Sequence, residues 1–115
     1  MKFLIFVYGT LKHDFHNHQI IADQKFIGHG ETLGEHWQMY SLGGFPGVVH
    51  GDKTIVGELY EVDEQAFQRC DRLEGHPHFY RREIVEVLDS DGVVHHPWMY
   101  IYQGEVEHLQ KVEGW

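Results

Sequence analysis

The sequence is poor in cysteine and proline, and each scarcity excludes a class of protein. Cys70 is the only cysteine among 115 residues, so no disulfide can form within the chain. The three prolines lie apart, and no Pro/Ser-rich stretch indicates a linker. We therefore expect residues 1–115 to form a single domain, of a size that can bury its own core without disulfide or metal staples.

Long apolar runs are missing as well. A membrane-spanning helix needs about 18 or more such residues, whereas the longest candidate starts at Phe3 and breaks at Gly9 before Lys12. This run also lacks the small-residue cleavage site of a signal peptide. We interpret it as the first strand of a cytoplasmic protein that has no membrane partner.

Positive charge is scarce too. Nine Lys and Arg against 18 Asp and Glu give a net charge of −9, while eleven histidines make this charge sensitive to pH between 5 and 7. Such a chain repels nucleic-acid phosphates and anionic lipid, so we expect no nucleic-acid partner. A small anionic ligand stays compatible with this charge, because backbone amides can bind an anion locally.

One helix stands out among the elements that the sequence does contain. It is expected over Asp63 to Glu74, where Asp63 can cap the N-terminus and Phe67, Cys70 and other apolar residues fall at helical spacing. Gly75 ends it. Within this pattern Cys70 is interpreted as a core residue and not as a nucleophile.

The other expected elements are short. Asn17 can cap a second short helix, and Pro97 indicates an edge or a bulge in the last strand. Strands are expected at residues 3–8, in hairpins between 25 and 49, and at 54–62, 80–88 and 93–103. Without regular βαβ repeats, this order predicts an α+β fold: a small mixed or mostly antiparallel β-barrel with two short flanking helices.

Two segments could carry chemistry. The first is the loop Tyr8-Gly9-Thr10-Leu11 after the first strand, where glycine allows successive backbone N–H groups to approach an anionic ligand. Taken alone, this pattern is equally that of a turn.

The second segment contains Glu74 at the C-terminal end of the expected helix. The helix dipole and unpaired carbonyls disfavour a negative charge there, and in a dry site the pKa would rise toward the range of a general base. The alternative is a solvated carboxylate that pairs with Arg72 or Arg81.

Together these segments resemble the γ-glutamylcyclotransferase family, in particular its small γ-glutamylamine cyclotransferase-type members. The resemblance rests on the loop Tyr8 to Lys12 after an N-terminal strand, on Gly-Glu-Leu-Tyr at 57–60, on Leu-Glu-Gly at 73–75, and on Tyr-Arg-Arg at 80–82. It covers about residues 3 to 103. Thr10 stands where many members carry serine, which keeps the hydroxyl.

The resemblance implies a compact mixed barrel and a cyclotransferase that releases 5-oxoproline and a free amine from a γ-glutamyl amine or γ-glutamyl amino acid, without a cofactor. It further implies that Glu74 is the general acid/base. The residues that it places around the substrate are Tyr8, Gly9, Thr10, Leu11, Tyr80 and one of the two tyrosines Tyr100 and Tyr102, with Tyr102 preferred.

Several alternatives stay open at this point. The same cavity could bind a metabolite or a signalling nucleotide without catalysis, or the chain could be an oligomeric scaffold with a vestigial cavity. No histidine group matches a zinc signature, so we expect no metal. Five aromatics could line a cleft but are mostly expected in the core: Trp37, Tyr40, Phe45, Tyr60 and Trp98. The leaving group and the oligomeric state are not predicted.

Overall fold

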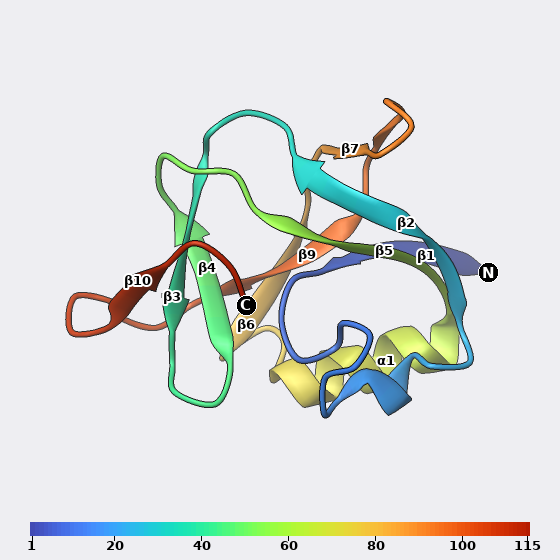
Figure 1. The fold of residues 1–115 in the computed structure, drawn as a ribbon. Coiled ribbons are helices and arrows are strands. Elements are labelled where there is room, and N and C mark those ends of the chain that lie inside the picture. The colour runs from blue at the N-terminus through green and yellow to red at the C-terminus, as the bar shows by residue number, and fades with distance from the viewer.

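A computed structural model, which describes all 115 residues, contains two β-sheets and one α-helix (Figure 1). The larger sheet is curled into a half-barrel, and the smaller one packs beside it. The larger sheet has the order β6-β9-β1-β5-β2-β7-β8 and the smaller one the order β10-β3-β4. This confirms the predicted α+β class and the mixed, mostly antiparallel sheet.

The strands are short, as expected. In the larger sheet they are β1 (Lys2–Val7), β2 (Lys25–Thr32), β5 (Val56–Asp63), β6 (Tyr80–Ile84), β7 (Val87–Asp89), β8 (Val94–His95) and β9 (Trp98–Tyr102). In the smaller sheet they are β3 (Trp37–Ser41), β4 (Pro46–His50) and β10 (Gln110–Val112). The short strand β10 lies beyond the predicted elements.

Strand β1 runs through the middle of the larger sheet. It pairs antiparallel with β5 and parallel with β9. Ile5 and Val7 belong to one buried cluster, whereas Phe6 belongs to the other. Because successive side chains of a strand point to opposite faces, β1 is covered on both faces, which confirms the interpretation of its continuous apolar run.

Helix α1 (Glu64–Glu74) forms where the sequence predicts it. The Asp63 carboxylate accepts a hydrogen bond from the Ala66 amide at 2.8 Å, an N-cap that stabilises a helix by about 1 kcal/mol. Gly75 ends the helix with a left-handed φ of 63°. Cys70 is fully buried, and burial raises the pKa of its thiol to about 12, so the thiol is a core group.

Two local predictions are wrong in part. A short helix follows Asn17 as predicted, but it is the 3-10 helix η1 (His18–Ile20), and the side chain of Asn17, at the N-cap position, does not cap it. Residues 80–88 do not form one strand, because the chain changes partner after β6: β6 pairs with β9, whereas β7 pairs with β2 and β8. Pro97 lies at the matching break between β8 and β9.

The aromatic residues divide between core and surface. Trp37 and Tyr60 are buried, whereas Phe45 is 36% exposed. No helix of the structure is both long and apolar enough to cross a membrane.

Candidate active site

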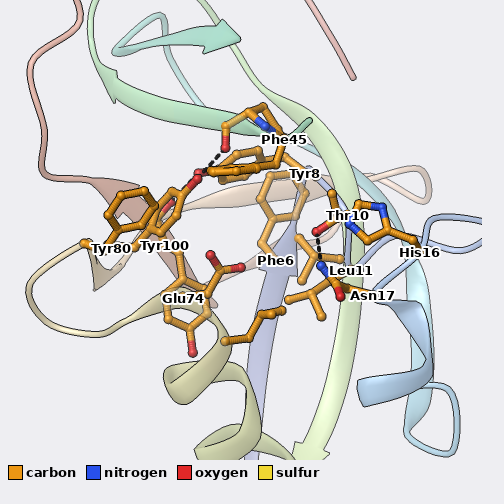
Figure 2. Close-up of a pocket in the computed structure, with 15 residues that line it drawn as sticks. Phe6, Tyr8, Thr10, Leu11, His16, Asn17, Phe45, Glu74, Tyr80 and Tyr100 are labelled. Carbon is orange, nitrogen blue, oxygen red and sulfur yellow. Dashed lines mark hydrogen bonds between the residues drawn. The ribbon is translucent and has the colours of Figure 1, made fainter. Parts of the chain in front are cut away.

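A cavity of about 210 Å³ lies where the larger sheet meets the β3–β4 hairpin (Figure 2). Its walls come from four separate parts of the chain: the end of β1 with the following loop, the turn before β4, the C-terminal end of α1 with the next turn, and strands β6 and β9. Two regions far apart in the sequence, Tyr8 to Leu11 and Glu74, therefore line the same cavity.

Most of the predicted site residues line this cavity. They are Tyr8, Gly9, Thr10, Leu11, Glu74, Tyr80 and Tyr100. Tyr102 is not among the lining residues, which corrects the preference for it over Tyr100. Its ring packs instead on Tyr80 and Phe79, with centroids 5.7 and 5.4 Å apart.

The loop after β1 lines the cavity and contains unpaired backbone donors. Lys12 N–H closes a turn on the Gly9 carbonyl, whereas the N–H groups of Gly9, Thr10 and Leu11 donate no hydrogen bond within the chain. A Cβ on Gly9 would lie 2.9 Å from Pro46 Cγ, so only glycine fits here against β4. Three consecutive free N–H groups are the feature that anion-binding backbone concavities share.

Thr10 adds a hydroxyl to these donors. The Asn17 Nδ2 group donates to Thr10 Oγ1 at 2.9 Å, and the Asn17 backbone N–H donates to the Thr10 carbonyl at 3.1 Å. The Thr10 hydroxyl proton has no acceptor in the chain. Asn17, mistaken for a helix cap, thus orients Thr10; no spacing rule in the sequence signals this contact across seven residues.

The hydroxyl groups of the three cavity tyrosines all donate hydrogen bonds to acceptors within the protein. The hydroxyl of Tyr8 donates to the Tyr100 carbonyl (2.7 Å), that of Tyr80 to the Pro46 carbonyl (2.6 Å), and that of Tyr100 to an Asp71 carboxylate oxygen (2.6 Å). Burial is the largest cause that raises the pKa of all three phenols. They stay protonated, and their oxygens can only accept from a ligand.

The Glu74 carboxylate has no hydrogen-bond or ion-pair partner in the chain. Burial raises its pKa from 4.5 to about 7. The alternative interpretation, an ion pair with Arg72 or Arg81, is wrong: Arg81 pairs with Glu83 at 3.1 Å, and neither arginine forms an ion pair with Glu74. Figure 2 shows Glu74 and Tyr80 on one side of the cavity and Thr10 and Asn17 on the other.

A sequence profile described as gamma-glutamyl cyclotransferase, AIG2-like, matches residues 5–115 of the chain. The chain belongs to this family. The gamma-glutamylcyclotransferase family protein YtfP of Escherichia coli K12 is 32% identical over 110 residues, which cover 96% of this chain and 91% of the relative. The gamma-glutamylaminecyclotransferase of Rattus norvegicus is 39% identical over 106 residues, which cover 76% of this chain and 66% of the rat protein.

The fold agrees with this assignment. The crystal structure of an AIG2-like protein from Mus musculus matches with a TM-score of 0.84 and 29% identity, covering 99% of this chain and 88% of the mouse chain. The predicted γ-glutamylcyclotransferase family and the predicted cyclotransferase-like enzyme class are confirmed. The roles of the individual site residues stay predictions.

Behind the cavity of this γ-glutamylcyclotransferase-family protein lies a charged network that the sequence did not reveal. Arg82 donates two hydrogen bonds to Asp71, at 2.9 and 3.1 Å, and its guanidinium lies over the rings of Phe67 (4.3 Å) and Trp98 (4.6 Å). Asp71 also accepts the Tyr100 hydroxyl. The network therefore holds a wall of the cavity in place.

The histidines do not gather into a metal site. No group of three or more His, Cys, Asp or Glu side chains could hold a metal ion. His16 lies at the edge of the cavity, and the cavity lining contains no Lys or Arg.

Proposed function

We propose that this protein converts a γ-glutamyl amine or γ-glutamyl amino acid to 5-oxoproline and a free amine, with Glu74 as general acid/base. One observation carries the proposal. Glu74 is the one carboxylate of the cavity lining, it has no partner in the chain, and its pKa of about 7 matches proton transfer near neutral pH.

The raised pKa matters because of the proton that must move. The substrate α-ammonium has an ordinary pKa near 8, so its transfer to a base of pKa about 7 is uphill by about 1.4 kcal/mol. A carboxylate at the ordinary value of 4.5 would face about 5 kcal/mol for the same transfer. Burial of Glu74 thus removes most of the free-energy cost of this proton transfer.

The distribution of donors and acceptors suggests how the glutamyl group is oriented. The free N–H groups of Gly9, Thr10 and Leu11 suit its α-carboxylate or a developing oxyanion. The tyrosine oxygens and the Glu74 carboxylate can only accept, which suits the α-ammonium. With the carboxylate at the loop and the ammonium at Glu74, the amine proton lies within reach of the base.

The reaction needs no further nucleophile. Once Glu74 has taken one proton, the α-nitrogen attacks the γ-carbonyl carbon, and a five-membered ring closes as the N–C bond forms. The bond from that carbon to the leaving nitrogen then breaks. In total the α-nitrogen loses two protons and the leaving nitrogen gains two, so one carboxylate can carry both in turn. Holding the chain folded supplies proximity.

The size of the cavity favours a glutamyl ligand over a signalling nucleotide. The volume of about 210 Å³ lies below the about 300 to 1,000 Å³ that is usual for small-molecule pockets. This accommodates a glutamyl group, whereas much of a nucleotide would have to lie outside the cavity. An unpaired carboxylate would also repel phosphates. A metabolite-binding role without turnover differs from the proposal only in its chemistry, so an activity assay separates the two.

The test is 5-oxoproline release from a panel of γ-glutamyl amino acids, γ-glutamyl-ε-lysine and γ-glutamyl polyamines. Glu74→Gln should lower kcat by about 100- to 10,000-fold on the active substrate, the usual contribution of a general acid/base. Glu64→Gln, at the exposed other end of the same helix, is the matched control and should retain activity.

Two results would contradict the proposal. Wild-type turnover by folded Glu74→Gln would remove Glu74 from the mechanism. No 5-oxoproline from any substrate, with folded protein, would favour the binding role and a search for a ligand that co-purifies in the cavity.

A further inference from the structure

The segment Gly-Glu-Leu-Tyr at 57–60 lies outside the cavity lining, although it lies beside the loop Tyr8 to Leu11 in the fold. It is part of strand β5, where Glu58 is paired with Val7, the residue just before that loop. Glu58 is only 8% exposed and forms no ion pair. Such a buried carboxylate is costly unless hydrogen bonds compensate for the lost water.

The Glu58 carboxylate binds the chain that follows the loop. Its Oε1 atom accepts a hydrogen bond from the His13 backbone N–H at 2.9 Å. The same oxygen accepts the hydroxyl of the buried Tyr60 at 3.0 Å. Burial, and then this hydrogen bond, raise the pKa of Tyr60, so the phenol keeps its proton and stays a donor. Glu58 is thus fixed by Tyr60 and provides an acceptor for His13.

Few other contacts anchor this part of the chain. Only two hydrogen bonds tie residues 9–17 to distant parts of the protein, and the rest are local. One is the bond between His13 and Glu58. The other runs from Lys12 Nζ, at the end of a long side chain, to the Trp115 carbonyl at 2.6 Å. Glu58 is therefore the one distant partner that binds the backbone of this segment.

Two backbone features agree with this role. A Cβ at Gly57 would clash with the Val7 carbonyl oxygen, so only glycine lets β5 approach the end of β1 this closely. Asp14, directly after His13, has a left-handed φ of 74°, which is uncommon for a residue other than glycine and persists where the surroundings hold it. The segment 57–60 thus determines where the chain leaves β1 and where it turns back.

We propose that Glu58 is a positioning residue for the reaction. By holding the His13 N–H, it keeps the unpaired N–H groups of residues 9–11 in the arrangement that binds the α-carboxylate of the glutamyl group. This inference rests on the proposed function and adds to it a residue that touches no substrate atom. The acceptor oxygen, and not the negative charge, performs this role, because Glu58 has no cationic partner.

Two substitutions of similar length separate the acceptor from the charge. Glu58→Gln keeps an oxygen acceptor and removes the charge, whereas Glu58→Met removes both. On a γ-glutamyl substrate that releases 5-oxoproline, Glu58→Met should raise KM about 10- to 100-fold and keep kcat within about threefold, because the α-carboxylate is bound equally before and during the reaction. Glu58→Gln should keep both within about threefold of wild type, since the hydrogen bond is retained.

The matched control is Glu61→Met, on the opposite face of the same strand, which should leave KM and kcat unchanged. Hydrogen exchange follows the positioning itself. The His13 amide should exchange at least about tenfold faster in Glu58→Met than in wild type or Glu58→Gln, while the amides of β5 keep their protection. If Glu58→Met does not fold, Tyr60→Phe replaces it: this variant loses the donor that fixes Glu58 and should raise KM about threefold.

Three results would overturn the positioning role. The first is an unchanged KM in folded Glu58→Met, or in Tyr60→Phe where that variant replaces it. The second is an equal rise of KM in Glu58→Gln and Glu58→Met, which would assign the effect to the charge. The third is a fall in kcat with KM unchanged, which would indicate a loss of folded enzyme and not a displaced loop.

Failure of the proposed function gives a different result. If the wild type releases no 5-oxoproline from any substrate, the proposed function fails, and the variants are compared through the Kd of L-glutamate, which carries the same α-carboxylate. A Kd that rises in Glu58→Met but not in Glu58→Gln would support the positioning role. Equal Kd values, or no binding by the wild type, would overturn it.

Discussion

Asp71 and Glu74 lie one turn apart on helix α1, and their surroundings shift the pKa values of these two carboxylates in opposite directions. At Asp71 burial alone would raise the pKa, but hydrogen bonds from Arg82 and Tyr100 together with the Arg82 charge outweigh it and hold the pKa below its usual value. At Glu74 burial acts without any opposing partner and raises the pKa to about 7.

The difference shows that position on a helix does not determine what a carboxylate does. Asp71 faces a guanidinium that lies over two aromatic rings, so its charge is fixed and structural. Glu74 faces a cavity and can exchange a proton. The ion pair also keeps Arg82 occupied, which leaves Glu74 free of a cation that would lower its pKa.

The largest expected effect is on the pH dependence of activity. Below its pKa of about 7, Glu74 is protonated and cannot accept the proton of the substrate, so kcat/KM should approach a tenfold fall per pH unit and drop about fiftyfold from pH 7 to pH 5. Initial rates across pH 5 to 9 measure this. An acid limb centred near pH 4 to 5 would mean that Glu74 has the pKa of a solvated carboxylate. The contrast with Asp71 would then disappear.

Removal of the structural carboxylate should come next in size. Asp71→Ala leaves the Arg82 guanidinium without its partner and should lower the free energy of unfolding by about 2 kcal/mol at pH 7, discounted for partial exposure. Because the folded-state pKa of Asp71 is depressed, this loss should diminish as the pH falls below about 4. Urea unfolding measures it.

The control for this change is the double variant Asp71→Ala/Arg82→Met, which removes both charges. It should recover part of the loss, since no unpaired charge is then left behind. A double variant less stable than the sum of the two single changes would contradict the ion-pair interpretation.

Substitution of Glu74 should raise the free energy of unfolding, whereas substitution of Asp71 lowers it. The folded-state pKa of Glu74 lies above 4.5, so the folded state binds more protons between pH 4.5 and 7, and wild-type stability falls across this window. Glu74→Gln escapes this loss and should be more stable than wild type by about 1 to 2 kcal/mol at pH 8, with the gain fading toward pH 4.5. Thermal unfolding at several pH values measures it, with Glu64→Gln as the variant that should show no such gain.

The smallest expected effect concerns Tyr100, which donates a hydrogen bond to Asp71 and lines the cavity together with Glu74. Tyr100→Phe removes a hydrogen bond to Asp71 and should cost about 1 kcal/mol of stability. It should also raise the pKa of Asp71 toward its ordinary value, which carboxylate NMR titration can follow. An unchanged Asp71 pKa would show that Arg82 alone holds it down.

The sequence predicts the fold well where local patterns decide it. The run of β1, the Asp63 cap and the Gly75 stop of α1 each depend on neighbouring residues, and each appears as expected. The break between β6 and β7 is not predicted, because it depends on the pairing partners β9 and β2, which lie far away in the chain.

The candidate site was predictable in part for the same reason. Motif residues such as Glu74 and Gly9 were found through their family resemblance, whereas Asp71 and Asn17 gave no local signal. Their partners lie 7 to 29 residues away. Tyr100 and Tyr102 lie on the same face of their strand, so the strand pattern alone does not separate them.

The close approach of Gly9 to Pro46 joins the first strand's loop to the second sheet, and this has a consequence for cooperativity. The cavity exists only when both sheets are docked, because Pro46 contributes a wall and accepts the Tyr80 hydroxyl across the junction. No folding intermediate that lacked the β3–β4 hairpin could retain the pocket. Ligand protection against hydrogen exchange should therefore extend through both sheets as one cooperative unit.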